Sequence, residues 1–588
     1  MAESIISPGV LTRENDISFI TPAPIQAGAA FIGPTVKGPN NQPTIVTSYN
    51  DFTRKFGETF TSGSSNYEFL TSLAVKNYFS QGGNTALITR VVSGSYTGAT
   101  NTFISASAKG STEPFTLATL GKGVMYNNAA GQLTALAGGS SYINTDGSLV
   151  SGSADNFRWE IQNVNNAQGT FTVLVRQGDD STNNPTILET FNNVSLDPKS
   201  PNYIEAVIGN QYTTVGTDGS TSYIYKEGTY PNRSNFLRVS AVNLATPNYL
   251  STDGITVNKD TTGQSYSGSL PVSASGSFYN ASGAVKSGAT YFENLGTNNN
   301  DAQGLVAANY ATAISLLSNR DEYQINIVSA PGMIHSSTIG QSVNNSIISL
   351  AEQRGDCIAV VDLVPTGSML STVTTQAAAI NSSYAATYWP WVQVQSATGK
   401  NQYVPAGTVI PGVYAFTDNA SAPWFAPAGL VRGGLAGVIQ AERKLTKGDR
   451  DTLYLGKVNP IATFPGTGIS VFGQKTLQTK ASALDRENVR RLLIELKKFI
   501  GDQARNLVFE QNTIATRNRF LATVNPYLES VVQRQGLYAY RVVMDDSNNT
   551  ADVVDRNQLV GQIFIQPTKT IEFVVLDFTI EPTGATFA

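Results

Sequence analysis

Two side chains of this sequence could supply nucleophilic or acid–base chemistry, and each stands alone. His335 is the sole histidine of the 588 residues, so a histidine-based dyad or triad would have to be built around it. Its place between a predicted strand and a predicted helix favours a capping or surface role. Cys357 is the sole cysteine and opens an apolar strand, where a free cysteine usually behaves as a small buried hydrophobic residue. We therefore predict no catalytic residue at either position.

Carboxylates flank the strand that Cys357 opens. Asp362 stands near the C-terminal end of this strand, where parallel α/β sheets often carry functional groups, and Asp356 stands before its start. Neither belongs to a second carboxylate cluster or follows a phosphate-binding loop. The sequence therefore favours a capping or turn role for both.

Glycine-rich and acidic stretches also lack the spacing of known binding loops. The segments Arg432-GGLAG and Pro465-GTG do not have the spacing of phosphate-binding loops and indicate tight turns. The acidic run lacks the spacing of a calcium-binding loop and indicates a solvated loop; it comprises Asp545, Asp546, Asp552 and Asp555. We expect no metal, no cofactor and no enzymatic activity.

Four basic residues gather on the longest predicted helix, which covers about 485–510. Its apolar residues recur at helical spacing and form one stripe: Val489, Leu492, Leu493, Leu496, Phe499, Ile500, Ala504, Leu507 and Val508. The opposite surface carries Arg490, Arg491, Lys497 and Lys498. Such a surface is usually just solvated, but four like charges could also contact an acidic partner.

The composition argues against several classes of protein. Hydrophobic residues make up 41% of the chain and charged residues only 14%, well below the roughly 25% that is usual for soluble domains. A net charge of −4 gives no basic footprint for nucleic acid. One cysteine excludes internal disulfides. The N-terminus lacks the regions of a signal peptide, and no run approaches the ~18 apolar residues of a membrane span, so we expect cytosol-like surroundings and no membrane insertion.

Alternating strands and helices at both ends of the chain predict an α/β core. Strands are predicted at 28–39, 43–48 and 85–92, with helices at 49–57 and 66–82 between them. Strand and helix alternation resumes at Ala302 and predicts a parallel sheet covered by helices. Between these parts, about 93–300 is rich in Gly, Ser, Thr and Asn with short alternating strands, which indicates one or two inserted antiparallel β domains.

The C-terminal region is predicted to hold the long helix, a helix at about 513–522 and a third short helix opened by Asn525-Pro526. Strands follow at 537–544 and 561–567. The last predicted strand, Thr570 to Ile580, is apolar on both faces and therefore needs partners on its faces and edges. Residues 1 to about 25 carry three prolines and indicate an extended arm.

Several segments, taken in order, resemble the contractile tail sheath proteins of myovirus-type bacteriophages. Toward the N-terminus they are Ser7-PGV, Ala29-AFIGPTVKGP, Ile45-VTSYNDFTRKFG and Tyr78-FSQGGNTALITRVV. Toward the C-terminus they are Ala422-PWFAPAG, Gly468-ISVFGQKTL, Asn488-VRRLLIELKKFI, Val508-FEQNT and Ile565-QPTKTIEFVVL. The β-rich region at 93–300 shows no such resemblance, which fits the variable outer insertions of that family.

The resemblance implies a mechanical role in a virion tail assembled in the host cytoplasm. Sheath subunits stack as hexameric rings around a tail tube, between baseplate and tail terminator proteins, and contract to drive the tube through the host envelope. In that family the terminal arms add strands to neighbouring subunits. Here the implied arm residues are Val10, Leu11, Ile17, Phe19, Ile571, Phe573, Val575, Leu576 and Phe578. The implied tube-facing residues are Arg490, Arg491, Lys497 and Lys498.

The predicted fold is thus an α/β core, made of a parallel α/β unit and a C-terminal α+β domain, with one or two inserted antiparallel β domains and extended arms. The expected division is an N-terminal arm at 1–25, core segments at 26–92 and 301–421, the insertion at 93–300, a C-terminal domain at 422–566 and a C-terminal arm at 567–588. A β-rich receptor-binding or surface-layer protein is the alternative function. A polysaccharide-cleaving enzyme is a third hypothesis, supported only by spare carboxylates in the insertion.

Overall fold

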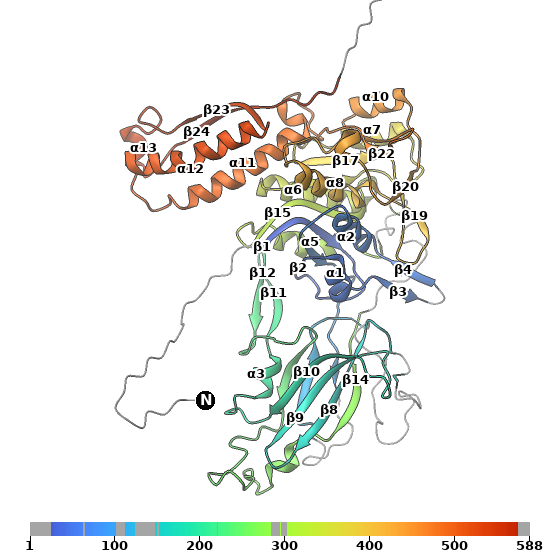
Figure 1. The fold of residues 1–588 in the computed structure, drawn as a ribbon, viewed down its shortest axis with the longest axis vertical. Coiled ribbons are helices and arrows are strands. Elements are labelled where there is room, and N and C mark those ends of the chain that lie inside the picture. Colours follow the sequence, from blue (N-terminus) through green and yellow to red (C-terminus); the bar gives the residue numbers. More distant parts are fainter. Residues whose placement is uncertain are drawn as a thin grey trace, which may run out of the picture.

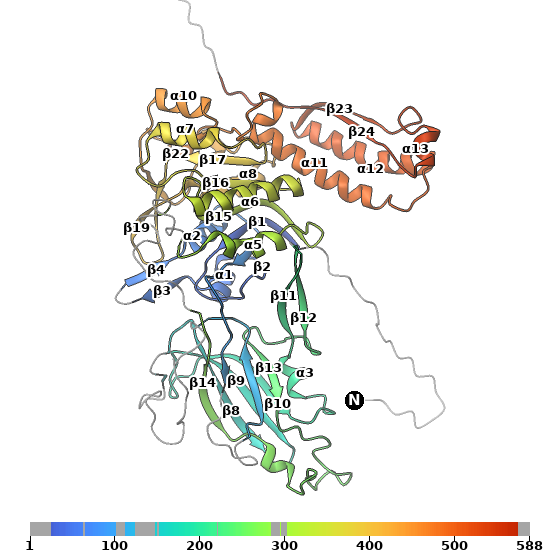
Figure 2. The same cartoon turned by 180° about the vertical axis from the view of Figure 1, so that it is seen from behind.

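The computed structural model describes residues 25–62, 65–101, 112–123, 148–149, 152–219, 221–283, 295 and 303–573. The described chain is elongated. A β-rich unit lies at one end, a layered α/β core lies in the middle, and a pair of long helices projects sideways from the opposite end (Figure 1). The reverse view shows the same order (Figure 2).

An eight-stranded sheet with the order β2-β5-β1-β15-β16-β17-β21-β22 forms the centre of the core. Its strands are β1 Ile25–Gly33, β2 Thr44–Val46, β5 Ala86–Arg90, β15 Tyr323–Ile334, β16 Ile358–Asp362, β17 Ala385–Trp389, β21 Asn459–Phe464 and β22 Gly468–Val471. The six inner strands run parallel, and the edge strands β2 and β22 run antiparallel to their neighbours. Because β1 pairs with β15, chain segments before and after the predicted insertion share one sheet.

Helices cover both faces of this sheet, because its inner strands are apolar on both sides. The helices α1 Tyr49–Phe56, α2 Leu70–Ser80 and α8 Ile410–Ala420 contribute to one apolar core. The helices α5 Ala307–Leu316, α6 Thr338–Arg354, α7 Leu370–Ala378 and α10 Lys447–Leu455 contribute to the other. This arrangement confirms the predicted mixed α/β fold.

Local signals in the sequence set the ends of these helices. The Ser48 side chain accepts a hydrogen bond from the Asp51 N–H at 3.1 Å, so α1 begins after Ser48, and it ends at Gly57. In the same way α6 is capped by Ser337 and ends at Gly355, which takes the left-handed conformation with φ 68°. The sequence predicts these helices at 49–57 and 336–354, within two residues of the observed ends.

Two smaller sheets and a short helix lie beside this core. The strands β3 Thr59–Ser62 and β4 Ser65–Glu68 form a hairpin. The strands β18 Val392–Gln395, β19 Asn401–Val404 and β20 Val438–Ala441 form a three-stranded sheet, with the short helix α9 Gly429–Arg432 nearby in the chain. The sequence predicted one strand over 385–394, and the structure divides it at Pro390, which has no N–H to donate. The sequence prediction also missed the helix α8 and the strands β21 and β22.

The β-rich unit contains a seven-stranded sheet with the order β10-β9-β8-β14-β6-β7-β13. Its strands are β6 Thr100–Asn101, β7 Phe115–Thr119, β8 Phe157–Asn165, β9 Thr170–Gln177, β10 Ile187–Ser195, β13 Leu237–Val242 and β14 Ala274–Tyr279, and it also contains the helix α3 Ile204–Ile208. All its strand pairs are antiparallel, as predicted for 93–300. Trp159 and Phe171 lie in its own apolar core.

A two-stranded ribbon joins the β-rich unit to the core. Its strands β11 Tyr212–Asp218 and β12 Thr221–Glu227 pair along their whole length. The Ser222 N–H donates to Ser315 Oγ of α5 at 2.8 Å, and Gln42 Nε2 donates to the Thr213 carbonyl at 3.2 Å. Both strands of the ribbon therefore contact the core, and the ribbon connects it to the β-rich unit.

The C-terminal part is a helix pair covered by a short sheet. It comprises α11 Glu487–Arg505, α12 Ile514–Gln533, β23 Leu537–Val543, α13 Ala551–Asp555 and β24 Gln562–Pro567. Leu492 and Leu496 of α11 share a core with Val524 and Leu528 of α12. The sequence prediction of a helix break at Asn525-Pro526 is wrong, because α12 continues through Pro526. Burial of Val524 and Leu528 on either side of the proline outweighs the lost hydrogen bond.

Candidate assembly surfaces and domain junction

A fully buried carboxyl group joins the C-terminal helix pair to the large sheet. Glu487 is the first residue of α11, and its side chain is inaccessible to solvent. Both of its oxygens accept hydrogen bonds from the Tyr388 hydroxyl of β17, at 2.7 and 2.8 Å. Asn459 Nδ2 of β21 donates to Glu487 Oε1 at 2.6 Å. The helix start is thus fixed to two neighbouring strands of the sheet.

Burial determines the protonation of this junction. It raises the pKa of Glu487 to about 8, although hydrogen bonds from Tyr388, Tyr414 and Asn459 act in the opposite direction. Burial and the nearby Glu487 also raise the pKa of Tyr388 well above its ordinary value. The Glu487 carboxyl group is therefore largely protonated near neutral pH.

The prediction that Arg490 and Arg491 lie on an exposed helix surface is wrong. They are 4% and 5% exposed. Arg491 forms an ion pair with Asp418 of α8 and lies 4.5 Å from the Tyr414 ring centre. Arg490 lies 4.0 Å from the Tyr384 ring centre and donates to Ser383 Oγ. Helical periodicity shows which residues share a face, but the first turns of α11 are covered on this face as well.

Lys497 and Lys498, two turns further along α11, remain accessible. Lys497 is exposed, with Nζ 3.3 Å from the Tyr384 hydroxyl, and Lys498 is half-buried, with Nζ 3.0 Å from Asn326 Oδ1. They line a groove of about 240 Å³ together with Arg320, Arg505 and Val508. Asp356 and Asp502 also line it, so cations exceed carboxylates. We call this the cationic groove.

The short sheet β23–β24 has open edges. Within the described part of the chain, each strand pairs only with the other. Tyr538 of β23 and Phe564 of β24 are 63% and 56% exposed. Unpaired edges beside exposed apolar side chains can accept further strands.

The segment after β24 is fastened to the core by one carboxylate. Arg486 donates to both oxygens of Glu572, at 2.7 and 3.0 Å, and Gln474 Nε2 donates at 3.0 Å. Partial burial alone would raise the pKa of Glu572, but the hydrogen bonds, that from Arg486 foremost, hold it below its ordinary value. Glu572 therefore fixes the direction in which the chain leaves the core.

The predicted arm residues are placed only in part. Ile571 and Phe573 flank Glu572 and are 85% and 78% exposed, and residues 571–573 form no strand. Val575, Leu576 and Phe578 lie outside the described residues, as do Val10, Leu11, Ile17 and Phe19. Their assignment to arms stays a prediction.

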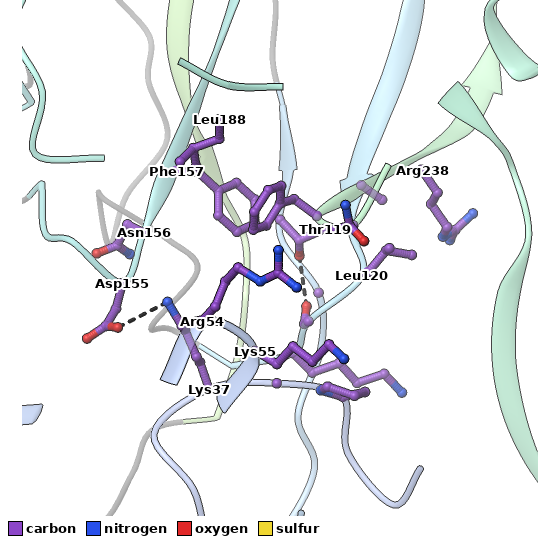
Figure 3. A pocket seen from close by; sticks show the side chains of 18 of the residues that line it. Lys37, Arg54, Lys55, Thr119, Leu120, Asp155, Asn156, Phe157, Leu188 and Arg238 are labelled. Atoms are coloured by element: carbon purple, nitrogen blue, oxygen red, sulfur yellow. Dashed lines mark hydrogen bonds and ion pairs between the residues drawn. The ribbon is translucent and has the colours of Figure 1, made fainter. Parts of the chain in front are cut away.

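Two larger clefts lie on the core. The aromatic cleft, of about 650 Å³, lies between Trp424, Phe472 and the segment 568–573. The core–insert cleft, of about 840 Å³, lies where the core meets the β-rich unit. Figure 3 shows Arg54 and Lys55 on the core side of the core–insert cleft and Phe157 and Leu188 on the other side.

Both large clefts contain more cations than carboxylates. The charged residues lining the core–insert cleft are Lys37, Arg54, Lys55, Lys122 and Arg238, with Glu58 and Asp155. Lys37 and Asp155 form an ion pair across it at 3.1 Å (Figure 3). The charged residues lining the aromatic cleft are Arg432, Lys447, Arg450 and Lys569, with Asp451 and Glu572.

The candidates for chemistry take structural positions. Cys357 is buried, and burial raises the pKa of its thiol to about 12, which suits a hydrophobic role. Asp362 accepts from the Gly407 N–H at 2.8 Å, and Asp356 pairs with Arg354 at 2.8 Å. The predicted capping or surface role of His335 is wrong, because it is 2% exposed and Ser337 caps the helix.

Among the described residues no cluster of three or more His, Cys, Asp or Glu side chains could hold a metal ion. No described helix is both long and apolar enough to span a bilayer. The fold and these surfaces define a mixed α/β protein. Its candidate sites, within the described chain, are a buried junction, an open two-stranded sheet, a cationic groove and two clefts.

Family comparisons identify this class of protein more closely. Residues 303–477 match the model of the phage tail sheath protein central domain, and residues 479–581 match the phage tail sheath C-terminal domain. The resemblance predicted from sequence is therefore confirmed: residues 303–477 and 479–581 are similar to the central and C-terminal domains of the phage tail sheath family. The boundary between the two matches, at residue 478, falls eight residues before Arg486, which with Glu487 forms the junction described above.

Curated relatives agree with this assignment. The chain is 42% identical over 189 residues to the tail sheath protein of Vibrio phage KVP40, which covers 32% of this chain and 28% of that protein. It is 34% identical over 264 residues to the tail sheath protein of Enterobacteria phage T4, which covers 42% of this chain and 40% of that protein. The chain thus matches well under half the length of either relative.

A solved structure supports the fold. The crystal structure of a sheath tail protein from Listeria innocua is 10% identical, with a TM-score of 0.52, and the superposition covers 92% of this chain and 95% of that chain. At this identity the likeness concerns the fold alone.

The variant Glu487→Gln should remove a pH-dependent part of the stability. Because the folded-state pKa of about 8 exceeds the ordinary 4.5, the native state keeps a proton that the unfolded chain releases. Its contribution is complete below about pH 4.5 and is lost as the pH rises through about 8, by up to roughly 1.4 kcal/mol per pH unit. Glutamine has no proton to lose. We expect the unfolding free energy of the wild type to fall more steeply between about pH 5 and about pH 8.

Urea unfolding at several pH values measures this difference. The matched control is Glu510→Gln, which removes one carboxylate from the exposed turn after α11. Its curve should follow that of the wild type. Parallel pH profiles for wild type and Glu487→Gln would show that the buried carboxyl group does not titrate as described.

Proposed function

We propose that this chain is a structural subunit of a contractile phage tail sheath, which polymerises around the tail tube and contracts to drive it through the host envelope. The observation that carries this proposal is the ordered match of both sheath domains over residues 303–581. The open β23–β24 sheet and the cationic groove supply surfaces for such an assembly. The chain acts as a scaffold in this proposal and performs no enzymatic step.

Contacts between copies would use added strands. Residues 1–25 and 567–588 of neighbouring subunits would extend the open edges of β23 and β24, through main-chain hydrogen bonds. The exposure of Ile571 and Phe573 beyond the Glu572 anchor supports this role for the C-terminal arm. Main-chain bonds depend little on side-chain identity, so they suit a contact that persists while subunits rotate.

The predicted division of the chain belongs to this proposal. The core segments 26–92 and 301–421, the C-terminal domain 422–566 and the insertion 93–300 would act as units of the sheath subunit. The separate apolar core of the β-rich unit supports the insertion as a unit, and the core around α11 and α12 supports the C-terminal helices as another. The two cores on the faces of the large sheet include residues on both sides of position 421 and give the boundary there no support.

Further partners follow from the same role. Stacked hexameric rings of this chain would meet the tail tube protein inside, a baseplate at one end and a tail terminator at the other, in a virion tail assembled in the host cytoplasm. Lys497 and Lys498, in the cationic groove, are the proposed tube-facing residues. Arg490 and Arg491 are not proposed again, because they are buried.

Electron microscopy of the purified chain tests the proposal directly. Striated tubes or rings of constant diameter are expected. A monodisperse monomer at high concentration would contradict a sheath function. Specific retention on host envelope fragments, without tubes or rings, would favour the receptor-binding alternative.

Deletion of residues 1–22 should separate folding from polymerisation. The large sheet begins at Ile25, so the truncated chain should stay folded with an unchanged circular dichroism spectrum. Without its N-terminal arm it should form no tubes in negative-stain images. Tubes of normal length from the truncated chain would contradict the arm assignment.

The double variant Lys497→Glu/Lys498→Glu should weaken docking on the tube. Reversing two accessible charges should reduce co-sedimentation with tail tubes by roughly tenfold at low ionic strength, and less at high salt. The matched control, Lys199→Glu/Lys259→Glu, makes the same charge change at exposed positions of the β-rich unit. Equal co-sedimentation of both variants would argue against electrostatic docking through the cationic groove.

A further inference from the structure

The turn between α11 and α12 presents apolar side chains to solvent. Phe509 is 103% exposed, and Val508 and Ile514 are 62% and 64% exposed. We call these three residues the apolar tip. The sequence placed Val508 in the buried stripe of a helix to 510, but α11 ends at Arg505. Exposed apolar side chains grouped in this way mark contact sites more often than isolated ones do.

The backbone of the tip is strained. Phe509 has φ 69°, in the left-handed region that bulky residues rarely occupy. A residue kept in this region without a buried side chain gains nothing from packing in its own chain. Such strain is found at functional sites more often than elsewhere. The left-handed turn directs the ring away from the helix pair.

Polar contacts of the buried Arg517 and of Asn512 hold the turn in one arrangement. Arg517, 5% exposed, donates from Nε to Asn512 Oδ1 at 2.8 Å and pairs with Asp546 at 2.7 Å. Asn512 Nδ2 donates to the Gln558 carbonyl at 2.9 Å. The turn is therefore fixed to α12 and to the chain before β24. A side chain carried on a fixed backbone binds with less loss of conformational entropy than one on a mobile loop.

The apolar tip is continuous with the cationic groove. Val508 belongs to the tip and also lines the groove beside Lys497, Lys498 and Arg505. An apolar anchor next to cations fits an acidic surface that contains an apolar socket. The two large clefts of the chain itself, the aromatic cleft and the core–insert cleft, both carry excess cations and would repel the groove. A partner of different composition fits better than a second copy.

We propose that Phe509 is the hydrophobic anchor with which this surface docks on its partner, inserting into an apolar socket on an acidic protein surface. This inference rests on the proposed function, in which that partner is the tail tube. The lysines of the groove would steer the approach, and the buried phenyl ring would supply most of the affinity.

The variant Phe509→Gly tests the anchor without endangering the fold. Glycine takes φ 69° freely, so the unfolding midpoint should stay equal to that of the wild type or rise. The chain concentration that half-decorates preformed tail tubes in a pelleting assay should rise roughly 30-fold, as for a hot-spot residue. The control, Met369→Ala, removes a 73% exposed apolar side chain at the start of α7 without adding a capping group, and should change neither property.

Each result decides the question. Decoration by Phe509→Gly at the wild-type concentration would overturn the anchor, and a lower unfolding midpoint would show that Phe509 serves the fold instead. Failure of Phe509→Gly to polymerise in the absence of tubes would place the tip between copies of the chain and overturn the partner assignment. If the wild type itself decorates no tubes, the proposed function fails and this inference fails with it. The two failures can be told apart: the proposed function fails if the wild type decorates no tubes, whereas only the anchor fails if wild type and Phe509→Gly decorate tubes at the same concentration.

Discussion

The position of the entire C-terminal region depends on the buried carboxyl group of Glu487. A carboxyl group removed from water is costly unless its oxygens are hydrogen-bonded, and here Tyr388 and Asn459 supply the donors. Those donors belong to adjacent parallel strands, so the start of α11 can satisfy Glu487 in one place only. The open sheet, the cationic groove and the apolar tip are all carried by α11 and the elements packed on it. Their placement relative to the core therefore follows from this junction together with the contacts that Arg490 and Arg491 make one turn further along α11.

The neighbouring residue makes a second connection of the same kind. Arg486 holds Glu572, and through it the chain that leaves β24, within one residue of Glu487. The start of the helix pair and the exit of the C-terminal segment are therefore coupled. Any rotation of α11 against the sheet would either break the hydrogen bonds of Glu487 and the Arg486–Glu572 ion pair or move their partners with the helix. If the segment beyond Phe573 reaches a neighbouring subunit, as we propose, this coupling would transmit the orientation of one helix pair to the next copy.

Sequence patterns predicted the elements whose signals are local. Ser48 and Gly57 delimit α1, and apolar residues on both faces of β15 and β16 indicated an interior parallel sheet. The predictions failed where tertiary contacts decide. The charge of Arg490 and Arg491 suggested exposure, but Tyr384, Tyr414 and Asp418 arrive from distant parts of the chain to cover them. Pro526 suggested a break that packing of Val524 and Leu528 overrides. For Phe509 the apolar run Leu507-Val508-Phe509 has the same appearance as one more helical turn, and only the left-handed backbone reveals its exposure.

The C-terminal region keeps two kinds of contact apart. The edges of β23 and β24 offer main-chain groups, whose pairing tolerates changes of side chain and some rotation. The tip and groove offer an aromatic ring and lysines, whose binding needs a matching socket and weakens with salt. If they act as we propose, contacts between copies could persist during contraction while contact with the tube is released, because the two depend on different groups. Since α11 connects both surfaces to Glu487, a rotation at that junction would withdraw the tip from its socket and leave the strand pairing intact.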